Sequence, residues 1–439
     1  MTVAPAVPGF DRLALQARLE AAWRRSDAVF DLLAPEAFLR RPIALRQPFI
    51  FYAGHLAAFG WNQVLGGLLG RESPQPALDR LFARGIDPVG VDGYEGAEAW
   101  PSLDQTLRYR DRVRGALLGA MDEVESRAGS DVLAEHGRVY HLVIEHELMH
   151  HETLLYMVQQ LDRRLRRRPR TVPPYRFQGA AAPGTVAVPG ATVVLGERFD
   201  RVPFGWDNEF PEHAEEVAPF ALDRTPVRNG EWLEFMAAGG YTRAELWVEE
   251  SWAWRERVGH THPVFWTRAA RGPEAGVGGW TYQALADELP LEDVADWPVY
   301  VSWAEADAYA RWRGASLPTE AEYHAAARAA DVRWGDPAGG NFDFTHWGPT
   351  PVGMYGGTAA RDLAGNGWEW TRSRFGPFPG FEAWARTYAG YSADFFDEHH
   401  YVLLGGSWAT DRTLVRRSFR NWFQPHYPYV FAKFRLVRR

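Results

Sequence analysis

Four long segments in the N-terminal part of this chain repeat apolar side chains at steps of three and four residues. This period gathers the apolar residues on one face of an α-helix. The segments are LALQARLEAAWRRSDAVFDLL (13–33), FIFYAGHLAAFGWNQVLGGLL (49–69), SLDQTLRYRDRVRGALLGAMDEVESR (102–127) and RVYHLVIEHELMHHETLLYMVQQL (138–161). Amphipathic helices of this length pack as a four-helix bundle, which we expect to occupy residues 1–165.

The sequence changes character after about residue 185, where short apolar runs alternate with Gly, Pro, Trp and Asp turns. One helix is predicted to start at Asn229, and another follows Thr319, which forms a capping box with Glu322. The pattern predicts an irregular α+β domain over residues 185–439. Residues 166–184, which are rich in arginine and proline, fit a solvated linker better than a phosphate site.

Composition narrows the class of protein. A length of 439 residues favours two domains, and a net charge of −8 argues against a nucleic-acid partner. The chain has no cysteine, which excludes disulfides and thiolate ligands and fits a cytoplasmic protein. No segment approaches the roughly 20 apolar residues that span a bilayer, and the N-terminus lacks the pattern of a signal peptide.

The fourth helical segment carries a candidate metal site. His146 and His150 are four residues apart, so both imidazoles lie on one helical face. His151 points about 100° away from that face, and Glu152 also lies off it. A third ligand must come from a facing helix, and His55 is the histidine of the second segment. We therefore predict a site built from His55, His146 and His150.

The type of ligand does not decide the identity of the metal, because three neutral imidazoles with free coordination positions suit Fe(II) or Zn(II). His146, Glu147 and His150 also form HExxH, the zinc-peptidase motif, but the usual continuation of that motif is missing. Glu147 is equally suited to orienting an imidazole. We assign His136 and His141 structural or supporting roles.

The histidine of the second helix and the HxxxHxE pattern resemble the DinB-like domain of ergothioneine-type sulfoxide synthases. The second half resembles the C-type-lectin-like domain of the formylglycine-generating-enzyme type that these enzymes carry. The stretches that carry this likeness include FGWDNEFPEH, PVRNGEWLEFMAAGGYTRAELW, GNGWEWT, LLGGSWAT and RRSFRNWFQPHYPYVFAKFRLVRR. The resemblance thus implies a DinB-like four-helix bundle followed by a formylglycine-generating-enzyme-like domain.

Members of this family are mononuclear non-haem iron enzymes. They use dioxygen to join the sulfur of a thiol to the imidazole carbon of hercynine, leaving a sulfoxide, and a related selenoneine synthase branch forms the C–Se bond from a selenosugar. The resemblance implies Fe(II) at the histidine site, hercynine binding by Asn421 and Trp422, and a tyrosine as proton donor. Tyr388 and Tyr391 are the candidates for that tyrosine, and we favour Tyr391.

Departures from the family pattern bear on the chalcogen donor. The loop VGVDGYEGAEAW has no arginine between Arg84 and Arg108, whereas sulfoxide synthases that use cysteine or glutamylcysteine commonly carry arginines there. The family usually has a polar residue after the Asn-aromatic pair, and in this chain Phe423 replaces it. The common HEQQH is HELMH, so Leu148 and Met149 replace amides beside the metal.

A pocket with acids and aromatics suits a neutral donor rich in hydroxyl groups better than an anionic peptide. In this loop Asp92, Tyr94 and Glu95 offer such groups. We therefore predict the selenoneine synthase branch, with a sugar-linked selenol or thiol as donor and Asp92, Tyr94, Met149 and Phe423 among the substrate contacts.

Three alternatives stay open at this point. The first is a sulfoxide synthase that uses cysteine or γ-glutamylcysteine. The second is a zinc-bound DinB-like thiol transferase or hydrolase, and the third is a binding module without catalysis. Separately, Asp207, Asn208 and Glu209 suit either a structural cation or an exposed turn.

Overall fold

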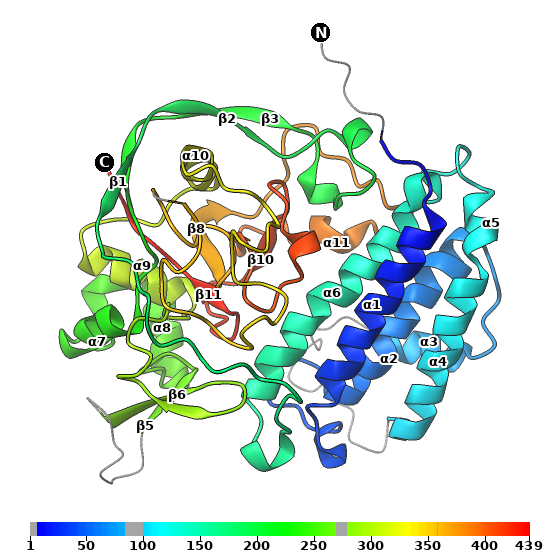
Figure 1. Cartoon of the computed structure of the whole chain (residues 1–439), viewed down its shortest axis with the longest axis horizontal. Helices are drawn as coiled ribbons and strands as arrows, with labels where there is room; N and C mark the ends of the chain where they lie inside the picture. The colour runs from blue at the N-terminus through cyan, green and yellow to red at the C-terminus, as the bar shows by residue number, and fades with distance from the viewer. Residues whose placement is uncertain (1–6, 84–99, 269–278, 358) are drawn as a thin grey trace. The chain divides into compact units, whose positions relative to one another are not determined.

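The computed structural model describes residues 7–83, 100–268, 279–357 and 359–439 (Figure 1). Contacts divide the chain into two compact units. The helical unit comprises residues 1–169, 198–207 and 382–391, and the second unit comprises residues 170–197, 208–381 and 392–439. The helical unit thus includes two short segments from the part of the sequence that follows residue 185. The predicted boundaries at 165 and 185 stay predictions.

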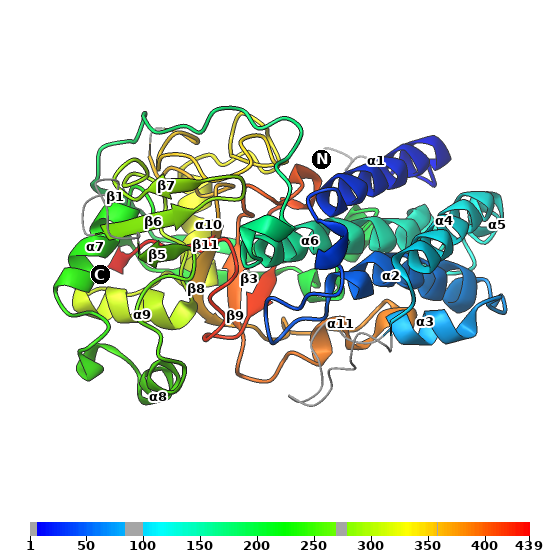
Figure 2. The same cartoon turned by 90° about the horizontal axis from the view of Figure 1, so that it is seen from below.

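The long helices of the helical unit are α1 (Arg12–Phe30), α2 (Phe49–Gly60), α4 (Leu103–Gly119) and α6 (Arg138–Gln159). They lie side by side in Figures 1 and 2, with α1 against α6 and α2 against both α4 and α6. Shorter helices are α3 (Pro76–Phe82), α5 (Met121–Glu125), η1 (Pro35–Ala37), η4 (Glu135–Gly137) and η5 (Arg163–Leu165). This arrangement confirms the predicted bundle. Among the described residues, every helix is too short or too polar to span a lipid bilayer.

The second predicted helix changes its winding halfway. After α2, residues Trp61–Leu68 form the π-helix η2 where the sequence predicted a continuous α-helix. Gly67 lies in this turn, and a Cβ there would stand 2.6 Å from Cγ2 of Thr387. The absence of a side chain on Gly67 therefore lets the 382–391 segment approach the backbone of η2.

The 198–207 and 382–391 segments are held in the helical unit by specific contacts. Arg386 makes two hydrogen bonds of 2.8 Å to the carboxylate of Asp131, which is a bidentate ion pair. The guanidinium of Arg138 on α6 lies 4.3 Å from the ring centroid of Phe199. Phe199 in turn packs against Trp384, with ring centroids 5.5 Å apart. The two segments are therefore bound to the bundle and to each other.

The second unit is a mixture of small sheets and helices, as predicted. One sheet has the strand order β1–β4–β12, another has β10–β9–β8–β11 with β11 parallel to β8, and the others are β2–β3 and β5–β6–β7. The strands are β1 (Thr185–Val188), β2 (Ala191–Leu195), β3 (His213–Val217), β4 (Phe220–Asp223), β5 (Trp266–Arg268), β6 (Trp280–Gln283), β7 (Glu288–Pro290), β8 (Trp368–Arg374), β9 (Tyr401–Leu404), β10 (Asn421–Phe423), β11 (Ala432–Lys433) and β12 (Val437–Arg438).

Three of the four long helices in the described part of the second unit begin at a capping box, and α8 begins without one. They are α7 (Asn229–Ala237), α8 (Glu249–Val258), α9 (Trp303–Trp312) and α10 (Glu320–Ala329), and short turns are η7 (Asp207–Glu209), η8 (Ala244–Leu246) and η11 (Arg412–Leu414). Segments η6 (Phe199–Arg201), η10 (Arg386–Tyr388) and α11 (Gly390–Ala393) lie in or next to the inserted segments. Thr319 and Glu322 form the predicted capping box of α10. Ser302 and Glu305 form the corresponding capping box of α9.

A buried group of charges lies where β8 and β11 pair. Glu369 on β8 accepts hydrogen bonds from Lys433 and Arg435, and all three side chains are fully buried. Lys433 also donates to the carbonyl of Gly367 at 2.6 Å. Burial lowers the pKa of Lys433, an effect that the carboxylate of Glu369 opposes. Glu369 thus balances two cations in the interior of the second unit.

Replacing Glu369 with glutamine is expected to lower the free energy of unfolding by about 3–5 kcal/mol, because it leaves two buried cations without their anion. Urea unfolding followed by tryptophan fluorescence measures this loss as a lower midpoint. The matched control is Glu216→Gln on β3, whose exposed carboxylate bonds Thr192 and should change stability by less than about 0.5 kcal/mol. Equal midpoints for the two variants would contradict the assignment.

Candidate metal centre

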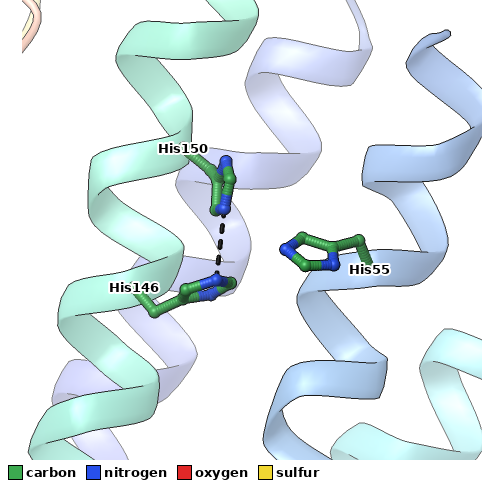
Figure 3. A group of neighbouring side chains, drawn as sticks. All are labelled: His55, His146 and His150. Atoms are coloured by element: carbon green, nitrogen blue, oxygen red, sulfur yellow. Dashed lines mark hydrogen bonds between the residues drawn. The ribbon is translucent and has the colours of Figure 1, made fainter. Parts of the chain in front are cut away.

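The predicted histidines converge inside the helical unit. His146 and His150 lie one turn apart on α6 and face His55 on α2 (Figure 3). One ring nitrogen from each of the three lies within 4.8 Å of the others, and all three side chains are buried. Among the described residues, His55, His146 and His150 are the one group of His, Asp or Glu side chains whose ligand atoms converge closely enough to hold a metal ion. The geometry agrees with the predicted ligand set.

The nitrogens are arranged as ligands of one ion. Nε2 of His146 and Nε2 of His150 are 3.2 Å apart. Two imidazole nitrogens bound to one ion at about 2.1 Å, at roughly a right angle, lie about 3 Å apart. Nε2 of His55 is buried and has no hydrogen-bond partner within the described residues. A bound cation would satisfy all three nitrogens, so the residues fit a metal ion.

Burial keeps the three imidazoles neutral, which is the form that binds metals. It lowers the pKa of His55 to about 4, although the hydrogen bond to the carbonyl of Phe82 acts in the opposite direction. Burial also lowers the pKa of His146 and of His150 well below the usual value, and the neighbouring histidines lower both further. The lone pairs of the ring nitrogens are therefore available near neutral pH.

A carbonyl at the end of α3 orients the first ligand. Nδ1 of His55 lies 2.7 Å from the carbonyl oxygen of Phe82 and donates its proton to it. This bond fixes the tautomer that leaves Nε2 free toward the cluster. Sequence patterns gave no signal for Phe82, because α3 is a single short helix (Pro76–Phe82) in a region without clear periodicity.

An aromatic ring supports the second ligand. The rings of Phe59 and His146 are parallel to within 4°, with centroids 3.5 Å apart. Phe59 lies four residues after His55 on α2, so the same helical spacing that predicted the ligand pair also places this ring beside the cluster. The four-residue spacing from His55 is therefore the sequence feature from which the position of Phe59 could have been predicted.

The neighbouring polar residues of α6 face other helices. Ser26 on α1 lies 2.5 Å from Glu147 Oε1 and 2.8 Å from His151 Nε2. Arg114 on α4 is 3.8 Å from the Glu147 carboxylate, and burial raises the pKa of that carboxyl group. Glu147 is therefore bonded between α1 and α4, which does not match the role of a base in a zinc peptidase.

The other histidines near α6 have structural partners. Nδ1 of His141 is 2.8 Å from the guanidinium of Arg18, and Nδ1 of His136 is 2.7 Å from the carbonyl oxygen of Pro8. Glu152 is buried on α6 but is not part of the cluster of converging ligand atoms. These contacts agree with the structural roles that the sequence predicts for His136 and His141.

Tyr391 and Met149 meet beside the cluster. The hydroxyl of Tyr391 donates to Sδ of Met149 at 3.6 Å, and Met149 precedes the ligand His150. Both residues belong to the helical unit. Tyr388 packs against Phe59, with ring centroids 5.1 Å apart. Tyr391 thus contacts a residue that adjoins the ligand His150 in the chain, while its catalytic role stays a prediction.

The predicted hercynine-binding residues lie in the second unit. Asn421, Trp422 and Phe423 form β10, and Oδ1 of Asn421 accepts from the backbone N–H of Trp422 at 2.9 Å. The ring of Trp422 stacks on Phe375 with centroids 4.1 Å apart, and Phe423 stacks on Tyr427 at 5.4 Å. Their role toward the substrate stays a prediction. Asp92, Tyr94 and Glu95 lie outside the described residues.

The acidic turn that was weighed as a cation site has protein partners. Glu209 accepts hydrogen bonds from Arg416 at 2.8 Å and from Ser418 at 2.6 Å. The amide of Asn208 donates to Ser392 at 2.9 Å. A guanidinium thus balances the Glu209 carboxylate, which favours the structural turn over a bound cation.

Comparison with known proteins matches both halves of the chain. Residues 18–154 match the DinB superfamily, and residues 171–439 match the sulfatase-modifying factor enzyme 1-like domain. The two families follow one another in the predicted order. The first covers the helices with the histidine cluster, and the second covers most of the α+β part.

Full-length relatives match over most of the chain. The hercynine oxygenase of Mycobacterium tuberculosis is 35% identical, with 87% of this chain and 89% of that protein covered. The hercynine oxygenase of Mycolicibacterium thermoresistibile is 36% identical, with 83% and 80% covered. Ergothioneine biosynthesis protein 1 of Neurospora crassa is 28% identical, with 95% of this chain and 57% of that protein covered.

Proposed function

Because this chain belongs to the family of hercynine oxygenases and ergothioneine biosynthesis proteins, we propose that it is an oxidoreductase acting on hercynine. The observation that carries this proposal is the buried cluster of three neutral imidazoles in the DinB-like bundle. We further propose that the enzyme forms a bond between the imidazole carbon of hercynine and a chalcogen donor, with dioxygen as oxidant.

His55, His146 and His150 would hold Fe(II), which supplies one-electron chemistry with dioxygen when it is bound. Three protein ligands leave open positions on the ion, so donor and dioxygen can meet at one centre. An oxygenase reaction favours iron over zinc, since zinc has no redox chemistry. The protein itself contributes neutral imidazoles, a fixed tautomer at His55 and an enclosed, largely apolar setting.

We assign the role of proton donor in the proposed reaction to Tyr391. Its hydroxyl donates to Met149, and its ring stacks on that of Trp206 with centroids 4.0 Å apart and an interplanar angle of 28°. A neutral phenol can donate its proton to a reacting oxygen and becomes a phenolate, and Tyr391 is only partly buried, so solvent can return the proton. The protein has no cysteine, so no thiol of its own competes with the donor.

We assign the binding of hercynine to Asn421 and Trp422. Hercynine carries a carboxylate and a trimethylammonium group, and an amide N–H and an indole face are matching partners for them. One face of Trp422 is covered by Phe375. The substrate would therefore use the other side of the indole.

Trp422→Ala is expected to weaken hercynine binding about 2- to 30-fold, because a cation–π contact contributes about 0.5–2 kcal/mol. Trp422→Phe should retain most of the affinity, since it keeps an aromatic face. Calorimetric titration of the metal-free full chain with hercynine measures both. Trp303→Phe, in a stacked pair with Tyr401, is the control, and an unchanged affinity in Trp422→Ala would contradict the assignment.

For the donor we propose a sugar-linked selenol or thiol, as in the selenoneine synthase branch. Met149 and Phe423 replace polar residues of the family pattern, and the 84–99 segment offers Asp92 and Tyr94 without an arginine beyond Arg84. Beyond Arg84 this segment has no cationic residue to pair with the carboxylates of a peptide donor. Cysteine or γ-glutamylcysteine is the second candidate, which the similarity to ergothioneine biosynthesis proteins favours.

The experiment that tests the function loads the full chain with Fe(II) without oxygen and then adds oxygen, hercynine and one donor at a time. The donors are a selenosugar, a thiosugar, cysteine and γ-glutamylcysteine, and product masses identify the coupled compound. Coupling with a sugar donor is the expected result. Coupling with cysteine or γ-glutamylcysteine alone selects the second donor class. No oxygen-dependent product from any donor, with zinc bound in the isolated protein, rejects the oxygenase function.

A further inference from the structure

A row of aromatic side chains leads away from the histidine cluster within the helical unit. It begins with Phe59, which stacks on the ligand His146 at 3.5 Å. Tyr388 contacts Phe59 with ring centroids 5.1 Å apart, and Tyr391 follows Tyr388 at 5.3 Å. Each step is a direct ring contact, so the inner half of the row joins the metal site to Tyr391.

The row continues outward through the 198–207 segment. Trp206 stacks on Tyr391 at 4.0 Å, Phe204 contacts Trp206 at 5.5 Å, and Trp384 contacts Phe204 at 5.7 Å. The indole N–H of Trp384 also donates to the carbonyl of Gly205 at 3.1 Å, next to Trp206 in the chain. Trp206 is buried, whereas Trp384 is only partly buried. The row therefore runs from the enclosed cluster to a partly exposed side chain, and Tyr388 and Tyr391 within it are also only partly buried.

The composition of the row bears on oxidation. Indoles and phenols lose one electron more readily than other side chains of a cysteine-free protein, and the row contains Tyr388, Tyr391, Trp206 and Trp384. The thioether of Met149, 3.6 Å from the Tyr391 hydroxyl, is the sulfur at risk, since methionine is readily converted to its sulfoxide. A site that handles dioxygen beside such a group benefits from an outlet for stray oxidising equivalents.

We propose that Tyr391, Trp206 and Trp384 carry oxidising equivalents from the metal site to the outer end of the row, and so protect Met149 and the histidine ligands when turnover fails. This role rests on the proposed oxygenase function. It requires a one-electron oxidant at the metal site and a thiol in solution as the final reductant.

Electrons and protons balance along the row. Tyr391 gives one electron and its phenolic proton to the oxidant and becomes a phenoxyl radical. Trp206 returns an electron to Tyr391, which takes a proton from water, and Trp384 then returns an electron to Trp206. The oxidised indole of Trp384 releases its N–H proton to water. A thiol restores the indole by giving a hydrogen atom, and two thiyl radicals combine to a disulfide.

The test uses the full chain loaded with Fe(II) and treated with hydrogen peroxide, without hercynine or chalcogen donor. Peptide mass spectrometry then measures oxidation at Met149, Trp206 and Trp384. In Trp206→Phe we expect oxidation of Trp384 to fall several-fold and Met149 sulfoxide to rise several-fold. Addition of a thiol should protect Trp384 in the wild type. Trp23→Phe, a buried tryptophan of α1 under the guanidinium of Arg114, is the matched control.

Trp384→Phe provides a second test of the proposal if Trp206→Phe disturbs the fold. Circular dichroism detects such a disturbance. The Trp384→Phe variant should retain the initial rate, lose activity after fewer turnovers, and raise Met149 sulfoxide under peroxide. Equal Met149 sulfoxide in wild type and both variants overturns the proposal. Coupling activity plays no part in the peroxide arm. If the protein makes no coupled product but shows the shifted oxidation pattern, the proposed function is rejected and electron transfer along the aromatic row is supported.

Discussion

Replacing His150 with alanine is expected to reduce Fe(II) affinity by more than about 100-fold and to abolish the coupled product. Loss of a group that merely orients a ligand costs about 10- to 100-fold in metal affinity, and loss of the ligand itself costs more. His150 is one of three converging imidazoles, so its removal leaves two nitrogens on a buried ion. Equilibrium dialysis with iron analysis measures the affinity, and product mass measures the activity.

The matched control for this variant is His141→Ala on the same helix. His141 is bonded to Arg18 and stands outside the cluster, so its loss should leave iron binding unchanged. His55→Ala should reproduce the effect of His150→Ala, because the site needs ligands from both helices. Full iron binding in His55→Ala would show that α6 alone holds the metal.

Replacing Tyr391 with phenylalanine is expected to lower the rate of product formation by about 10²- to 10⁴-fold, the usual contribution of a positioned proton donor. Iron affinity and hercynine affinity should stay unchanged, because the hydroxyl donates to Met149 and the phenol is not one of the three converging ligands. Stopped-flow mixing of the anaerobic ternary complex with oxygen separates this step from binding.

Tyr388→Phe is the control for the Tyr391 variant. Tyr388 lies in the same segment and packs edge-on against Phe59, a contact that phenylalanine preserves. Its rate should stay within the range of the wild type. A large loss in Tyr388→Phe together with a normal rate in Tyr391→Phe would transfer the proton-donor role to Tyr388.

Much of the site follows from local spacing. Helical periodicity predicts α1, α2, α4 and α6, and a separation of four residues puts His146 and His150 on one face. The argument for His55 is that a buried bundle with two histidines on one helix needs a third ligand from another. Both steps depend on rules that act within one helix or between neighbouring helices, so one sequence is sufficient for them.

Other parts of the site depend on segments far apart in the chain. The Phe82 carbonyl reaches His55 because α3 ends beside α2, and no periodic pattern marks that seven-residue helix. The second predicted helix ends in the π-helix η2, where Gly67 leaves room for the close approach of Thr387. Such contacts are set by packing between distant residues, which local propensity does not encode.

The sequence by itself determined the bundle, the mixed second half, the histidine pair with its partner on α2, and the candidate tyrosines. Only the tertiary structure decided that residues 198–207 and 382–391 pack within the helical unit, and that Tyr391 contacts Met149 and Trp206. The physical reason is that helices arise from interactions within a few residues. The place of an irregular segment is fixed by side chains that it meets only after the chain has folded.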